Sequence, residues 1–107
     1  MVTIKDKGKI VLVTGAAKGI GKTTAEMFAT RGMKVILADV LEDDIKHNCT
    51  ELIQQGYFAD YYQVDVTESK EVKEMFLYIK EKYNRIDVLV NNAGITRDSL
   101  LHKMKDE

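Results

Sequence analysis

The 107-residue sequence contains no proline, no tryptophan and only one cysteine. A single cysteine cannot form a disulfide within the chain, which fits a reducing compartment, and we therefore expect a cytoplasmic protein. Long hydrophobic runs are also missing. No purely aliphatic stretch approaches the roughly 20 residues of a membrane span, and the first nine residues lack the apolar core of a signal peptide, so we expect no membrane partner.

Neither sign of charge dominates the composition. Sixteen basic residues face seventeen acidic ones, which gives a formal net charge of −1. Without a basic block to follow a phosphate backbone, nucleic acid is not an expected partner. The length suits a single domain over residues 1–107, and it is sufficient to bury a core.

Short apolar runs alternate with stretches of helical spacing along the chain. We expect strands at 10–13, 35–38, 58–64 and 86–90, and helices at 19–31, about 45–55 and 67–83. Such alternation predicts an α/β fold in which a parallel sheet of strand order 3-2-1-4 carries helices on both faces. The mixed composition of 58–64 suits an edge strand. The polar segment 95–107 is compatible with the start of another helix.

Apolar spacing also predicts which side of each helix faces the sheet. In the first helix we expect Ile20, Met27 and Phe28 to face inward. In the second we expect an inward stripe with Cys49 buried: Ile45, Cys49, Leu52 and Ile53. The third helix should start at Thr67 as its N-cap. Its inward stripe is the longest of the three: Val72, Met75, Phe76, Ile79 and Tyr83.

Three glycines follow the first expected strand in a G-x3-G-x-G pattern. Gly15 would permit a tight turn, Gly19 would let backbone approach a ligand, and Gly21 would allow a helix to pack closely. The first N–H groups of the following helix would then face an anion such as a diphosphate. Asp39 ends the next strand, 18 residues after Gly21, close to the spacing expected of a ribose-binding carboxylate.

Four motifs at the strand ends together resemble the main form of the short-chain dehydrogenase/reductase family: residues 14–21, Asp39, 65–67 and 91–94. The resemblance covers essentially the whole chain. It implies a Rossmann-type, three-layer α/β/α domain that binds a nicotinamide dinucleotide, with Asp65 and Val66 at the adenine and 91–94 beside the adenosine ribose. Residues 95–101 are similar to the 3-oxoacyl-(acyl carrier protein) reductase branch, so a 3-oxoacyl thioester is a possible substrate.

The choice of cofactor depends on Asp39. A carboxylate accepts hydrogen bonds from the ribose hydroxyls of NAD but repels the 2′-phosphate of NADP, so we predict NAD rather than NADP. Two points stand against this choice. Lys18 occupies a place where NADP-using members of the resembled family often carry a basic residue, and the 3-oxoacyl-(acyl carrier protein) reductase branch commonly prefers NADP. The full set of residues predicted to bind the cofactor is Gly15, Lys18, Gly19, Ile20, Gly21, Asp39, Asp65, Val66, Asn91, Ala93 and Gly94.

We predict no catalytic residue and no metal site in the chain. The resemblance implies that a catalytic serine and a Tyr-x3-Lys pair follow the fourth strand, beyond residue 107. Tyr78 and Lys82 match that spacing but lie in the third helix, before the fourth strand, so we interpret them as a surface pair. The remaining candidates form no catalytic or metal-binding pattern: His47, Ser69, Ser99 and His102.

The chain is thus expected to be the cofactor-binding half of an oxidoreductase, truncated after strand four and inactive alone. The bare edge of strand four would pair with a missing C-terminal half or with a second copy. Two alternatives stay open. One is a non-catalytic nucleotide-sensing module. The other is a P-loop hydrolase, since 16–23 is a Walker A motif with Ala16 replacing its first glycine.

Overall fold

All four predicted strands form and lie parallel in one sheet. The computed structural model describes residues 7–93. The strands are β1 (Ile10–Thr14), β2 (Lys34–Asp39), β3 (Ala59–Gln63) and β4 (Val88–Asn91). Their order is β3-β2-β1-β4, which confirms the predicted topology and the edge position of the third strand.

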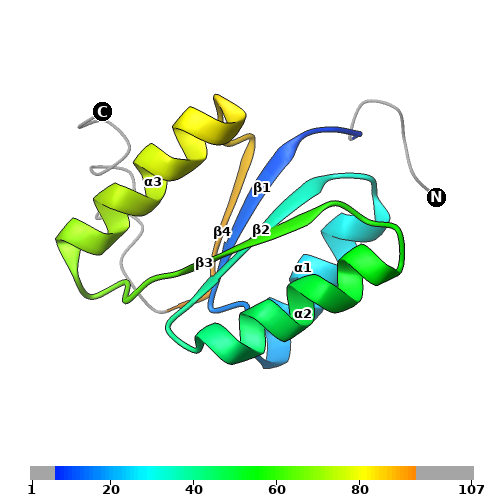
Figure 1. Cartoon of the computed structure of the whole chain (residues 1–107), viewed down its shortest axis with the longest axis horizontal. Helices are drawn as coiled ribbons and strands as arrows, with labels where there is room; N and C mark the ends of the chain where they lie inside the picture. Colours follow the sequence, from blue (N-terminus) through cyan, green and yellow to red (C-terminus); the bar gives the residue numbers. More distant parts are fainter. Residues whose placement is uncertain (1–6, 94–107) are drawn as a thin grey trace.

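Three helices connect the strands: α1 (Gly19–Thr30), α2 (Glu42–Gln54) and α3 (Ser69–Tyr83). Figure 1 shows α1 and α2 on one face of the sheet and α3 on the other, as right-handed crossovers in a doubly wound sheet require. The fold is therefore the predicted three-layer α/β/α arrangement. The helix considered for 95–107 lies outside the described residues.

Strand β1 is buried along its whole length because it faces helices on both sides. Val11 and Val13 belong to the apolar cluster under α1 and α2, whereas Ile10 and Leu12 belong to the cluster under α3. This alternation follows from the two-residue period of a strand. A run of branched apolar residues is what such a central strand needs, since neither of its faces meets water.

Helix α1 packs on the sheet with a different side from the one we predicted. Ile20 is 77% exposed and Met27 48% exposed, while Ala25 and Ala29 are buried. The prediction followed the large apolar side chains and was wrong because small residues let the helix approach the sheet closely. Only Phe28 of the three predicted residues packs against the core, and it does so partly buried.

The other two helices follow their predicted stripes with two corrections. In α2, Cys49 is buried as expected, but Ile53 is exposed and Asn48 takes an inward position. In α3 the core positions are confirmed, with Tyr83 partly buried. Thr67 is not the N-cap. Glu68 holds that position, because the Thr67 hydroxyl donates to a neighbouring carboxylate instead.

The two edges of the sheet are formed by β3 and β4. Strand β4 pairs with β1 alone, and within residues 7–93 no strand lies along its other side. All four residues of β4 are partly exposed, although two of them, Val88 and Val90, are valines that pair with β1. None of the three helices of this part of the chain has the length and apolar character of a membrane span.

The packing of α1 gives a first prediction. Ala25→Leu should lower the free energy of unfolding by about 1–3 kcal/mol, because a larger side chain overfills a fully buried site against the sheet. Met27→Ala should change it by no more than about 0.5 kcal/mol, since that side chain is half exposed. Urea unfolding of both variants measures the difference. A larger loss for Met27→Ala would contradict the packing described.

Candidate functional site

The carboxyl ends of the four strands bring the predicted motifs together. Thr14 at the end of β1 pairs in register with Ala38 on one side and with Asn91 on the other. Asp39 pairs with Gln63 at the next strand. Loops that leave these ends therefore meet at one edge of the sheet. In open α/β sheets this is where ligands bind, at the point where the strand order reverses.

Each of the three motif glycines meets a different steric demand. Gly15 has a φ of +67°, and a Cβ there would come within 2.8 Å of the Asn92 carbonyl oxygen. A Cβ on Gly21 would overlap the carbonyl oxygen of Gly15, so the first turn of α1 lies directly against the loop. Gly19 also has a positive φ, of +58°, but open space lies where its Cβ would be. That space leaves the backbone approachable by a ligand.

The start of α1 has the features of an anion site. Its N-cap, Lys18, makes no side-chain capping bond, and its first turn carries no acidic residue. The first N–H groups of a helix have no acceptor within the helix, and the helix dipole favours a negative charge beside them. In α2, by contrast, Glu42, Asp43 and Asp44 occupy the first turn. A diphosphate is thus chemically suited to the N-terminus of α1.

Two backbone groups hold the Asp39 carboxylate in place at the end of β2. One oxygen accepts the N–H of Ala17 at 3.1 Å, and the other accepts the N–H of Leu41 at 3.0 Å. The Ala16 N–H donates to the Ala38 carbonyl at 3.2 Å, so the glycine-rich loop is fastened to β2 at two successive residues. The carboxylate is therefore oriented before any ligand arrives.

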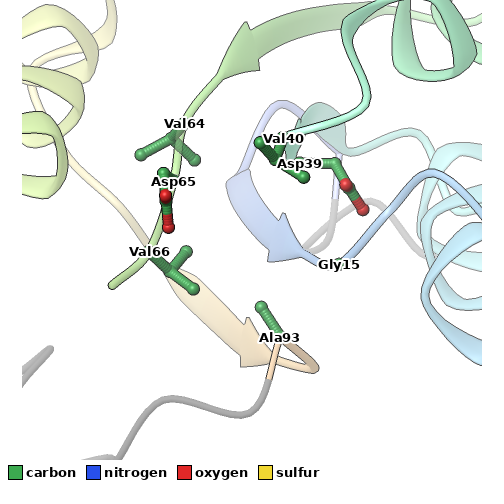
Figure 2. Close-up of a pocket in the computed structure, with 7 residues that line it drawn as sticks. All are labelled: Gly15, Asp39, Val40, Val64, Asp65, Val66 and Ala93. Atoms are coloured by element: carbon green, nitrogen blue, oxygen red, sulfur yellow. The ribbon is translucent and has the colours of Figure 1, made fainter. Parts of the chain in front are cut away.

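A pocket of about 200 Å³ opens beside this carboxylate. Figure 2 shows the segment 64–66 on one side of it and Asp39 with Val40 on the other, with Ala93 completing the wall. The volume is below the roughly 300–1,000 Å³ of a site that encloses a whole drug-sized ligand, so it suits one part of a larger molecule. The full lining is Gly15, Asp39, Val40, Val64, Asp65, Val66 and Ala93.

Asp65 enters the pocket from the segment after β3. Its carboxylate accepts both the hydroxyl of Thr67, at 2.6 Å, and the Thr67 backbone N–H, at 3.0 Å. These bonds, the hydroxyl's above all, lower the pKa of Asp65, so the group is ionised at neutral pH. A fixed carboxylate between Val64 and Val66 can accept a hydrogen bond from an amino group lying between two apolar walls.

The last predicted segment is tied to β1 through a buried threonine. The Thr14 hydroxyl accepts the N–H of Asn92 at 3.1 Å and lies 3.3 Å from the Asn91 side-chain oxygen. These bonds bring the chain after β4 against the glycine-rich loop. Ala93 consequently reaches the pocket, whereas Gly94 lies outside the described residues.

The two remaining predicted residues are exposed at the start of α1. The Lys18 ammonium lies 4.0 Å from the Asp44 carboxylate, and its side chain is 75% exposed. An exposed pair of this length contributes little, at most about 1 kcal/mol. Ile20 is an exposed apolar side chain between Gly19 and Gly21. Both side chains are exposed to solvent where α1 begins.

The Tyr78 and Lys82 pair does not line the pocket at the strand ends. It belongs to a polar cluster centred on Asp60 of β3, which we call the Asp60 cluster. The carboxylate of Asp60 accepts the hydroxyls of Tyr78 at 2.8 Å and Tyr83 at 2.7 Å, and the ammonium of Lys82 at 3.0 Å. The pair is thus more than the surface contact we predicted: it fastens α3 to the edge strand. The Lys82 ammonium also lies 3.1 Å from the Tyr78 hydroxyl.

Other reactive side chains within residues 7–93 form no catalytic arrangement with the pocket. His47 is exposed and lies 3.4 Å from Glu51 on the same helix. Ser69 begins α3 and is exposed. Burial, assisted by the charge of Asp60, raises the pKa of Cys49 to about 11, so the thiol is not ionised at pH 7. Ser99 and His102 lie outside the described residues.

Comparison with known proteins identifies the family. The model of the short chain dehydrogenase family matches residues 9–107, and the chain belongs to that family. The 3-oxoacyl-[acyl-carrier-protein] reductase FabG of Thermotoga maritima is 46% identical over 101 residues, which are 94% of this chain and 41% of that protein. The chain therefore spans about two fifths of the length of the curated relatives it matches. Because the match includes residues 16–23, the family assignment argues against the alternative of a P-loop hydrolase.

Solved structures of the family include complexes with both nicotinamide dinucleotides. A short-chain dehydrogenase/reductase from Burkholderia phymatum in complex with NAD has a TM-score of 0.76 at 29% identity, over 81% of this chain and 31% of that one. A metagenomic short-chain oxidoreductase in complex with NADP has a TM-score of 0.79, also at 29% identity, over 83% of this chain and 40% of that one. Members of the family are thus known in complex with NAD and with NADP.

The Asp60 cluster gives a prediction about stability and pH. Burial would raise the pKa of Asp60, but the bonds from Tyr83, Lys82 and Tyr78 outweigh it and lower the pKa below 3.8. A lowered folded-state pKa stabilises the protein above about pH 4, and this contribution is lost as the pH falls through the folded-state value. Asp60→Asn should therefore reduce the free energy of unfolding at pH 7 by about 1–3 kcal/mol.

Urea unfolding at pH 7 and at pH 3 measures this effect. The difference between wild type and Asp60→Asn should shrink at the lower pH, because at pH 3 the unfolded wild type binds a proton at this carboxyl group more readily than the folded state, whose pKa is lowered. Glu81→Gln, an exposed change on α3, is the matched control and should cost little at either pH. A deficit of equal size at both pH values would contradict the assignment of an ionised, hydrogen-bonded Asp60.

Proposed function

We propose that residues 1–107 form the dinucleotide-binding part of a short-chain oxidoreductase and that the cofactor is NAD. The observation that carries the proposal is the Asp39 carboxylate, held by the N–H groups of Ala17 and Leu41 at the mouth of the pocket. Because it is already oriented, this group can accept the ribose hydroxyls of NAD without first being ordered.

The same carboxylate disfavours NADP. Two like charges 4 Å apart repel by about 1 kcal/mol in bulk water and by about 4 kcal/mol at an effective dielectric constant near 20. Lys18 offers a compensating positive charge, but its side chain is exposed to solvent and already lies near Asp44. An exposed ion pair supplies at most about 1 kcal/mol, so the effect of Asp39 should prevail.

The other predicted residues receive roles from their places around the pocket. We assign the diphosphate to the backbone of Gly19, Ile20 and Gly21, with Lys18 beside it, because this helix start is uncapped. Asp65 and Val66 would hold the adenine. The ribose would lie between Asp39 and the segment that supplies Asn91, Ala93 and Gly94, with Gly15 forming the turn beneath it.

The bound nicotinamide would supply the hydride exchanged with a carbonyl or secondary alcohol. The chain's own share of this reaction is to bind and orient the cofactor. Because several relatives are named 3-oxoacyl-[acyl-carrier-protein] reductases, we propose a 3-oxoacyl thioester as the substrate of the complete enzyme. We expect these 107 residues alone to bind the cofactor without catalysing turnover.

The free side of β4 completes the proposal. Within the described part of the chain this strand pairs with β1 only, and its residues are partly exposed. An unpaired edge of this kind favours addition of another strand. We propose that the added strand comes from the rest of a longer enzyme or from a second copy.

Asp39→Asn tests the choice of cofactor. The change keeps one acceptor oxygen for the backbone and removes the charge, so the affinity for NAD should fall about tenfold while that for NADP stays equal or rises. Calorimetric titration with each dinucleotide measures the ratio. Asp43→Asn, which removes an exposed charge from the first turn of α2, should leave the ratio unchanged. An unaltered ratio in Asp39→Asn, or a folded wild type that binds neither dinucleotide, would refute the proposal.

A further inference from the structure

One polar side chain is buried in the apolar face of α2. Asn48 is 5% exposed and lies beside Ile45, Cys49 and Leu52, which are all buried. Burying an amide without hydrogen bonds is costly, so its partners explain why it is there. Its Nδ2 group donates to the carbonyl oxygens of Ala16 at 3.2 Å and Ala17 at 3.0 Å. Both acceptors belong to the glycine-rich loop.

These bonds fix the peptide group between Ala16 and Ala17 at both ends. Its carbonyl oxygen is held by Asn48, and its N–H is held by the carboxylate of Asp39. A trans peptide group is planar and its C=O and N–H point in opposite directions, so two partners on opposite sides leave it no freedom to rotate. Asn48 and Asp39 thus act on the same rigid unit from α2 and β2.

The next peptide group is fixed at one end. Its carbonyl, from Ala17, points at Asn48, and therefore the N–H of Lys18 points the opposite way, away from α2. Lys18 is the N-cap of α1 and is followed directly by Gly19, which has a positive φ and open space around it. The direction of the loop as it enters the anion site is consequently set by Asn48.

We propose that Asn48 is a positioning residue for the dinucleotide, which it does not itself contact. It holds two successive peptide groups of the glycine-rich loop, orders the entry to the first turn of α1 and secures the Ala17 N–H that orients Asp39. This inference rests on the proposed function, since it concerns the same site. A loop that contains glycines would otherwise have to be ordered when the ligand binds, and ordering in advance saves that entropy.

The test uses Asn48→Leu, which keeps the size of the side chain but removes its donor. Without ligand, hydrogen exchange at the Ala17 N–H should become faster. This increase should be larger than any increase in the exchange of the α2 amides. With NAD, calorimetry on the folded variant should show about tenfold weaker binding. Should Asn48→Leu not fold, Asn48→Ser serves, because its short hydroxyl cannot reach both carbonyls, and the same two changes are expected.

Cys49→Ala is the matched control. It removes a buried group from the same face of α2, so it should lower stability without changing the Ala17 exchange or the NAD affinity of the folded protein. Wild-type values of both quantities in a folded Asn48 variant would overturn the inference. A wild type that binds no dinucleotide would instead refute the proposed function, and the exchange measurement would still decide whether Asn48 holds the loop.

Discussion

The site depends on one close backbone approach, that of the first turn of α1 to the loop that leaves β1. Gly21 lies against the Gly15 carbonyl, and no residue with a Cβ could take its place without moving the helix. The approach continues along α1 because Ala25 and Ala29 present small side chains to the sheet. A helix held this close directs its uncapped N-terminus to the end of β1, beside the pocket between the strand ends.

Polar side chains then hold the glycine-rich loop and the segment after β4, which the close packing of α1 does not fix. The glycine-rich loop receives a carboxylate from β2 and an amide from α2, while Thr14 ties the segment after β4 to β1. Each of these side chains is held by backbone groups, so the orientation of the site comes from the fold and does not await a ligand. Pre-organisation of this kind reduces the entropy lost on binding and favours a charged or hydroxyl-rich ligand over an apolar one.

The strand order and all seven elements could be predicted from the sequence because the apolar runs and the glycine motif both point to one fold. The inward side of α1 could not, since spacing rules weigh large apolar residues and this helix buries alanines. The roles of Val40 and Asn48 were also missed. Val40 directly follows Asp39, and this position in the sequence could have indicated that it lines the pocket. Asn48 stands three residues after Ile45 on the buried face of α2, where a polar residue indicates a specific hydrogen-bond partner. That partner is 31 residues away in sequence, so its identity required the structure.

Tyr78 and Lys82 show why a motif acquires meaning only from its position. Their spacing matches the family's catalytic pair, and their hydroxyl and ammonium even lie within hydrogen-bonding distance. Yet the Asp60 carboxylate occupies both groups at the β3 edge, on the opposite border of the sheet from β4. Burial and the bond to Asp60 raise the pKa of Tyr78, whereas an acid/base catalyst needs a pKa near the operating pH. The same two residue types thus contribute to stability here, because the group beside the lysine is a partly buried carboxylate and not a reacting carbonyl.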